Sequence, residues 1–222
     1  MSIKAHKIPV QRTAHFYTIG EPSPEVEYLW IVCHGYGQLA KNFIRKFDVL
    51  ASPNTLIVAP EGLSRFYWGG VTGEVVASWM TKEDRLDEIA DYANMLSQIK
   101  DQLTPQLSPK HKTILFGFSQ GCATQVRWIM AKKPEYDALV LWAGAFPEDL
   151  DYNAPTAPDL NQKPNWFIYG DKDQYLTPKR IAMHEELIKS FKLKLEVIQF
   201  EGTHRVDRTV LKELSNQIYP FI

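Results

Sequence analysis

The chain has 222 residues, and its 25 Lys and Arg side chains nearly balance 26 Asp and Glu, which excludes the basic surplus that nucleic-acid phosphates require. No long uncharged apolar run occurs and the first ten residues lack the apolar core of a signal peptide, so we expect no membrane span and a cytoplasmic location. Cys33 and Cys122 are too few for a disulfide framework and have no zinc-binding spacing, so we expect neither disulfide nor metal.

Short apolar runs alternate along the chain with segments of helical period. This alternation predicts an α/β fold, a mostly parallel sheet covered by helices on both faces. Residues 15–19 alternate polar and apolar side chains and predict an edge strand. Runs rich in Ile, Val, Leu and aromatic residues predict strands buried on both faces at 28–33, 55–59, 112–117, 138–142, 165–169 and 194–200. The one linker-like stretch, 149–164, predicts a surface loop, so we expect a single domain over residues 1–222.

Three helices are expected between and after these strands, besides the one that follows the strand at 112–117. Thr81 and Asp84 resemble a capping box at the start of the first, and Thr177 with Pro178 predicts the N-terminus of the second. Their expected buried faces carry Leu86, Ile89, Ala93, Leu96, Ile99 and Leu103 in the first, Ile181, Leu187, Ile188 and Phe191 in the second, and Val210, Leu211, Leu214 and Ile218 in the last.

A candidate nucleophile lies where the strand at 112–117 meets the following helix, which runs through Met130. The sequence Gly117-Phe118-Ser119-Gln120-Gly121 is a GxSxG motif in the strand-turn-helix context of a nucleophile elbow. Such a turn strains the serine backbone, and the two glycines let strand and helix approach each other. The positive helix N-terminus can stabilise the oxygen anion that forms when a serine attacks a carbonyl. The motif therefore predicts Ser119 as a nucleophile toward an ester-like carbonyl.

A serine nucleophile needs a histidine base, and that histidine needs an acid to fix its tautomer. Of the histidines after Ser119, His184 falls within a predicted helix, where we expect a solvated face, and His204 lies in the loop after the strand at 194–200. We therefore predict His204 as the base. Asp171 and Asp173 both follow the strand at 165–169, and Asp171 can cap the local turn. The residues alone leave both carboxylates open as the acid.

Two further regions border the predicted site. The strand at 28–33 runs into His34-Gly35-Tyr36-Gly37-Gln38, so we expect the backbone N–H groups of Tyr36 and Gln120 to form an oxyanion hole. Aromatic residues in the loop after the strand at 55–59 suit an apolar acyl or alcohol group, or else close the core beneath that loop. The predicted substrate-binding residues are Phe66, Tyr67, Trp68 and Trp79.

In these features the chain resembles the carboxylesterase/phospholipase/acyl-protein thioesterase family of α/β-hydrolases. The resemblance rests on the HGYG loop, the GFSQG elbow, GDKD followed by Thr177-Pro178, and the EGTH loop, which together span about Trp30 to His204. It implies an α/β-hydrolase fold without a separate cap domain, Asp173 as the acid, and hydrolysis of esters or thioesters through an acyl-enzyme without a cofactor. Cys122 replaces a glycine that is common in the family, and the EGTHRVD loop is only loosely similar, which leaves the subfamily open.

The expected partner is a small-molecule ester or a lipid-like substrate, such as a lysophospholipid or an acyl thioester. Alternative hypotheses are a ligand-binding protein without catalytic activity on the same scaffold, since fold does not dictate function, and a peptidase or dienelactone-type hydrolase. The sequence leaves open the natural acyl and alcohol groups and the oligomeric state, a homodimer included.

Overall fold

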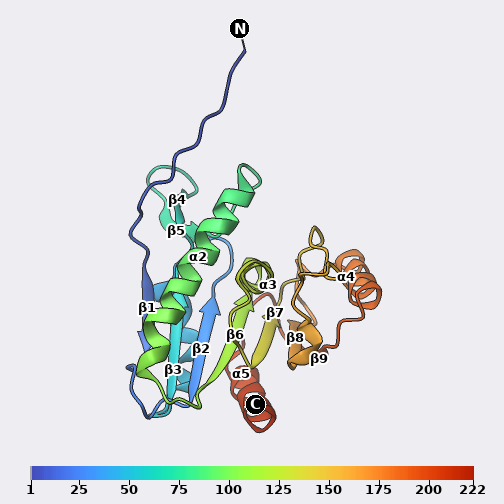
Figure 1. The fold of residues 1–222 in the computed structure, drawn as a ribbon. Coiled ribbons are helices and arrows are strands. Elements are labelled where there is room, and N and C mark those ends of the chain that lie inside the picture. The colour runs from blue at the N-terminus through green and yellow to red at the C-terminus, as the bar shows by residue number, and fades with distance from the viewer. Residues whose placement is uncertain (1) are drawn as a thin grey trace.

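The computed structural model describes residues 2–222, and its centre is a seven-stranded sheet of order β1-β3-β2-β6-β7-β8-β9 (Figure 1). The edge strand β1 (Phe16–Ile19) pairs antiparallel with β3 (Thr55–Pro60), and every other pair in this sheet is parallel. The remaining strands of the sheet are β2 (Tyr28–Cys33), β6 (Lys112–Phe118), β7 (Ala138–Trp142), β8 (Asn165–Gly170) and β9 (Glu196–Phe200). The predicted mostly parallel sheet, with its edge strand at 15–19, is confirmed.

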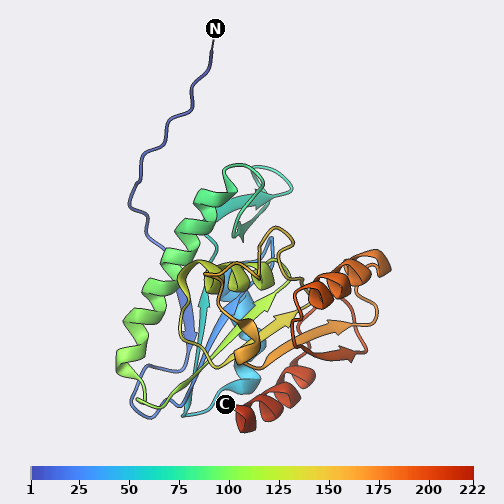
Figure 2. The ribbon, with the colours of Figure 1, turned by 45° about the vertical axis from the view of Figure 1, so that its right-hand side comes forward.

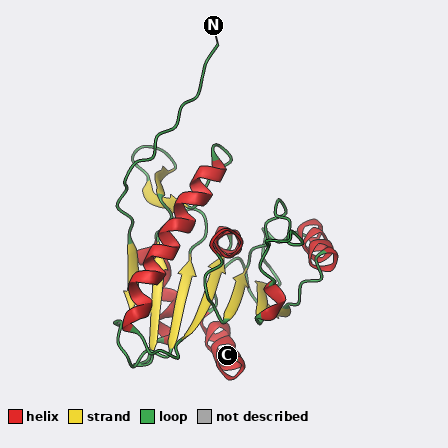
Figure 3. Cartoon of the chain, in the orientation of Figure 1, coloured by secondary structure: helices red, strands yellow, loops and turns green. Residues whose placement is uncertain are grey.

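Helices cover both faces of the sheet (Figures 2 and 3). Alternate residues of β2 enter opposite layers, since Leu29 and Ile31 belong to one core cluster and Trp30 and Val32 to the other. The first layer contains α2 (Arg85–Leu103), α3 (Gln120–Lys132) and Leu187 of α4 (Pro178–Ser190). The second contains α1 (Ala40–Phe43), the 3₁₀ helix η1 (Ile44–Leu50) and α5 (Arg208–Ile218). Burial on both faces explains why these strands are almost wholly apolar.

The start of α2 differs from the prediction. Asp84 adopts a left-handed conformation with φ 48°, its side chain makes no capping hydrogen bond, and the helix begins at Arg85. The N–H of Thr81 instead donates to Oε2 of Glu88 over 2.6 Å. Leu86 is 73% exposed, because the first turn of α2 projects beyond the sheet (Figure 2). The predicted capping box and the buried position of Leu86 were therefore wrong.

The expected loop around residues 65–70 is instead half of an antiparallel hairpin formed by β4 (Ser64–Trp68) and β5 (Glu74–Ser78). Gly69 and Gly70, both at positive φ, allow the chain to reverse between the strands. The hairpin is tied to the predicted oxyanion loop, since Gly37 N–H donates to Ala77 O and Ala77 N–H donates to Gln38 O. It therefore lies at the edge of the sheet where the parallel strands end (Figure 1).

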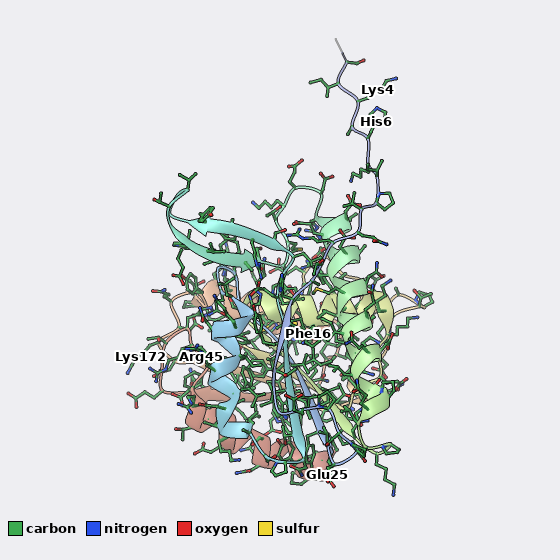
Figure 4. All side chains as sticks on the ribbon, turned by 90° about the vertical axis from the view of Figure 1, so that its left-hand side faces the viewer. Lys4, His6, Phe16, Glu25, Arg45 and Lys172 are labelled. Carbon is green, nitrogen blue, oxygen red and sulfur yellow. The ribbon has the colours of Figure 1, made fainter. Side chains whose placement is uncertain are left out.

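The N-terminal segment 2–15 forms no helix or strand and extends away from the sheet (Figure 1). Lys4 and His6 lie on its outermost part, far from Phe16 at the start of β1 (Figure 4). Lys7 forms exposed ion pairs with Asp84, at 2.8 Å, and with Asp87 at the start of α2. Exposed pairs of this kind contribute little to stability, whereas the end of the segment is fixed by the Glu61 N–H, which donates to His15 O over 3.0 Å.

Trp128 couples the two helices of the first layer. Its ring is fully buried, and its Nε1–H donates to Oγ of Ser97 over 2.9 Å, from α3 to α2. Trp128→Ala should lower the free energy of unfolding by about 3–5 kcal/mol, because it leaves a large cavity. Ser97→Ala removes only the hydrogen bond and should cost about 1–2 kcal/mol in urea unfolding. A Trp128 variant as stable as the Ser97 variant would contradict this account.

Candidate active site

Ser119 occupies the turn between β6 and α3 with φ 53° and ψ −116°. This positive φ is rare for a residue with a side chain, and it agrees with the strained conformation expected for the elbow. The Ser119 N–H donates to Trp142 O over 2.9 Å, which holds the turn against the carboxyl end of β7. The serine is thereby presented at the edge of the sheet, in front of the first turn of α3.

Glycines make the close approach at this elbow sterically feasible. A Cβ at Gly117 would lie 2.4 Å from Gly121 O, and one at Gly121 would lie 2.2 Å from Cys33 O. Gly144, which sequence reasoning did not single out, is equally constrained, since its Cβ would lie 2.3 Å from Ser119 O. The thiol of Cys122 fits beside it and donates to Gly117 O over 3.1 Å, so the turn accommodates this departure from the family pattern.

The structure brings Asp173 and His204 together from the loops after β8 and β9. His204 Nδ1 lies 2.7 Å from Oδ2 of Asp173, whose side chain is fully buried. The second carboxylate oxygen, Oδ1, accepts the Tyr175 N–H over 2.9 Å. A carboxylate at Nδ1 keeps the proton on that nitrogen, so Nε2 is left with its lone pair free. Asp171, the alternative acid, instead accepts the Gly202 N–H over 2.9 Å.

These two loops are interlocked by backbone contacts. The N–H groups of Asp171 and Lys172 donate to Phe200 O and Gly202 O, both over 2.9 Å. Trp142, buried in the second layer, donates its Nε1–H to Arg205 O over 2.8 Å. The loop that carries His204 is therefore fixed on both sides of the histidine.

Ser119 and His204 line the same cavity of about 310 Å³. Their side chains form no direct hydrogen bond within the described residues. Contacts between a nucleophile and its base are often long before substrate binds. The observation that places these two side chains near each other is therefore the cavity that both of them line. The His204 ring is further held between Phe118, at 4.9 Å between centroids, and Tyr175, at 4.6 Å.

The predicted oxyanion donors are neighbours of residues close to Ser119, since Gln120 follows it in the chain and a Cβ at Gly35 would lie 3.2 Å from Ser119 Cβ. Among residues 2–222, the backbone N–H groups of Tyr36 and Gln120 donate to no protein acceptor. The Gln120 side chain fastens the first turn of α3 to the end of β5, accepting the Trp79 N–H and donating to Met80 O. Gly35 N–H donates to Oε1 of Gln38, which orders the loop that carries Tyr36. Of these two residues, Gln120 lines the cavity and Tyr36 does not.

The predicted substrate-binding aromatics do not line this cavity. Phe66 and Trp68 pack on the Tyr36 ring, with centroids 5.4 and 5.7 Å away, and Tyr67 is 54% exposed on the hairpin. Trp79 is buried, and its Nε1–H donates to His34 O over 2.8 Å. Trp79 is thus a core residue, the alternative that sequence analysis left open. The cavity is lined instead by the loop after β7 and by α4.

His184 corrects a second expectation. It was predicted on the solvated face of its helix, yet it is 7% exposed, lines the cavity and accepts the Phe146 N–H at Nε2 over 3.1 Å. Burial lowers the pKa of His184 to about 4. The spacing of Ile181, His184 and Leu187 along α4 places all three on one face, which is the signal that could have predicted it.

Among residues 2–222, no group of three or more His, Cys, Asp or Glu side chains is arranged to hold a metal ion. None of the helices in that part of the chain has the length and apolarity needed to cross a bilayer. A larger groove of about 1040 Å³ lies between α2 and residues 10–16, and neither Ser119 nor His204 contributes to it.

Comparisons with known proteins bear on the family and the fold. Residues 15–222 match the family described as Phospholipase/Carboxylesterase. Among solved structures, esterase PE8 is similar over 93% of this chain and 100% of its own, with a TM-score of 0.71 and 19% identity. Acyl-protein thioesterase 2 of Zea mays is similar over 94% of this chain and 99% of its own, with a TM-score of 0.70 and 15% identity. A phospholipase/carboxylesterase from Dyadobacter fermentans is similar over 95% of this chain and 98% of its own, with a TM-score of 0.67 and 16% identity. No curated protein sequence matches the chain.

A fully buried histidine beside this site makes stability depend on pH. His34 accepts the Gly62 N–H at Nε2 over 3.0 Å, and burial lowers the pKa of its imidazole from 6.5 to about 4. Between pH 6.5 and 4 the unfolded chain binds a proton that the folded protein does not, so stability falls as the pH falls. The parent protein should lose about 3 kcal/mol more than His34→Gln across this range in urea unfolding. Parallel pH profiles for the two proteins would contradict this assignment.

Proposed function

Because the chain belongs to the phospholipase/carboxylesterase family and has the α/β-hydrolase fold, we propose that it is a serine hydrolase that cleaves carboxylic esters through an acyl-enzyme on Ser119. The observation that carries this proposal is the 2.7 Å contact between His204 Nδ1 and buried Asp173, at a cavity that Ser119 also lines. This is the arrangement of base and acid that a serine nucleophile requires.

In the proposed first half-reaction, the Ser119 hydroxyl attacks the ester carbonyl while His204 Nε2 removes its proton. Asp173 stabilises the imidazolium that forms, because its carboxylate already accepts the Nδ1 proton. The imidazolium then gives its proton to the departing alcohol oxygen, and the acyl group remains on Ser119. Water repeats the sequence in the second half-reaction and releases the carboxylic acid.

The negative oxygen of each tetrahedral intermediate has two donors within the proposed site. These are the N–H groups of Tyr36 and Gln120, neither of which has a protein acceptor in the described chain. Gln120 is also the first residue of α3, so the positive end of the helix dipole acts on the same oxygen. Donors fixed in advance stabilise developing charge without having to reorganise during the reaction.

The cavity suits an ester with an apolar acyl or alcohol group of small to medium size. Large apolar side chains line much of it, namely Phe146, Phe167, Leu176, Ile181 and Leu187, beside the polar side chains of Gln120, Glu148 and Arg180. A pocket of this kind binds an apolar group by removing it from water. A panel of esters, thioesters, amides and lactones tests how far the substrate range extends, with thioesters included because a maize acyl-protein thioesterase shares the fold.

Covalent labelling tests the nucleophile. An active-site phosphonate should label Ser119, and Ser119→Ala should abolish labelling and lower ester turnover by about four to six orders of magnitude. The thermal midpoint of the variant measures whether its fold is intact. Turnover that survives the substitution in a folded variant would refute the proposed mechanism.

Matched amide substitutions test the acid. Asp173→Asn should reduce kcat by about 10⁴-fold, since an amide no longer holds the correct imidazole tautomer. Asp171→Asn keeps an oxygen that can accept the Gly202 N–H and should change kcat by less than about tenfold. Steady-state kinetics on one ester compares both with the parent. If Asp171→Asn proves the more damaging change, the acid has been misassigned.

A further inference from the structure

The deep wall of the cavity contains a polar group that the proposed mechanism does not use. His184, from the second turn of α4, is 7% exposed and lies between two aromatic rings. Its ring centroid is 4.7 Å from that of Phe167, edge on, and 5.7 Å from that of Phe146. The charged side chains of the cavity wall, Glu148 and Arg180, are exposed to solvent, so His184 is the buried polar side chain among the described lining residues and requires an explanation.

One of the two ring nitrogens of His184 accepts a hydrogen bond from the protein backbone. Nε2 accepts the Phe146 N–H over 3.1 Å, so it carries a lone pair and not a proton. A neutral imidazole then has its single proton on Nδ1. Burial, which lowers the pKa of His184 to about 4, keeps the ring neutral at physiological pH. The Phe146 N–H thereby fixes the tautomer of His184.

The other nitrogen is free. Nδ1 donates to no protein acceptor within residues 2–222, and it is not sealed from solvent. Because the side chain is almost fully buried and lines the cavity, the access to Nδ1 is from the cavity. The Nδ1–H is therefore a hydrogen-bond donor at a fixed position in the cavity wall.

A purely structural role accounts for Nε2 but not for this donor. A buried N–H without a partner costs stability, and the cavity offers it only water or a bound ligand. A pocket that binds only hydrocarbon would be served better by an apolar side chain at this position, as at Ile181 and Leu187 on the same helix face. The position of the donor thus indicates the chemistry of the group that fills the cavity.

We propose that His184 forms a specificity subsite, in which its Nδ1–H donates to an ether, keto or hydroxyl oxygen on the apolar chain of the bound ester. The inference rests on the proposed esterase function and narrows its substrate class to oxygen-bearing acyl or alcohol chains. An ester with an acceptor at the right distance from the scissile carbonyl satisfies the donor, whereas the all-carbon ester leaves it unpaired.

Two series of matched esters test the subsite. One series replaces successive methylenes of the acyl chain by an ether oxygen, and the other does so in the alcohol chain, each against its all-carbon parent. At one position of one series, the parent protein should hydrolyse the ether-containing ester with a kcat/KM about three- to tenfold higher than that for the all-carbon ester. The series that responds identifies whether the acyl or the alcohol group occupies the cavity. No preference at any position in either series would overturn the inference.

Variants assign the preference to His184. His184→Phe keeps a planar ring without a donor, and His184→Met keeps a weak acceptor for the Phe146 N–H, so at least one is expected to fold. Either variant should still hydrolyse the all-carbon ester. The ratio of kcat/KM for the ether-containing ester to that for the all-carbon ester should fall to about one. The matched control Ile181→Ala, on the same helix face, should change kcat/KM for both esters of a pair alike and keep their ratio.

The outcomes separate this inference from the function on which it rests. An ether preference that survives in a folded His184 variant overturns the subsite. Phosphonate labelling of Ser119 in the same preparations reports on the nucleophile independently of the cavity. Labelled protein without an ether preference therefore refutes the subsite alone, whereas loss of the Ser119 reaction in the parent protein refutes the esterase proposal.

Discussion

The contact between the first turn of α3 and the carboxyl end of β2 is the constraint on which the site depends. The helix approaches the strand so closely that a Cβ at Gly121 would lie 2.2 Å from Cys33 O. This approach places Ser119 in its strained turn, aims the helix N-terminus at the serine and brings the loop after β2 alongside it. The hydrogen bond from Ser119 N–H to Trp142 O ties the same turn to β7. Packing across the whole sheet thus stabilises a backbone conformation that is unfavourable by itself.

The loops after β8 and β9 depend on that framework in a different way. Asp173 and His204 come from adjacent parallel strands, so their loops leave the sheet at one edge and can exchange backbone hydrogen bonds. Gly170 is essential to this arrangement because a Cβ there would lie 2.2 Å from Gly202 O. Hydrogen bonds from the neighbouring loop therefore fix the loop that carries the His204 imidazole. A short carboxylate contact in a buried setting then fixes its tautomer.

The strands, the elbow and the family were predictable from the sequence because each depends on a local pattern. Strands buried on both faces leave dense apolar runs, and the elbow requires glycines at fixed positions around one serine. The hairpin β4–β5 escaped prediction because its apolar runs, Phe66–Trp68 and Val75–Ala77, are short and face solvent in part. Leu86 was misplaced because helical period identifies a face but not where the sheet beneath it ends. The cavity could not be predicted at all, since it depends on how α4 packs against the loop after β7.

Three histidines show how hydrogen-bond partners give one side-chain type three different roles. His34 has both ring nitrogens occupied, by Gly35 O and by the Gly62 N–H, so it can only support the fold. His204 has Nδ1 occupied by Asp173, which leaves Nε2 free to accept a proton in the proposed mechanism. His184 has Nε2 occupied by the Phe146 N–H, which leaves Nδ1 free to donate. Whether the first partner is an acceptor or a donor therefore decides whether the second nitrogen is a base or a recognition group. This choice is made by tertiary contacts, so residue type alone does not distinguish the three.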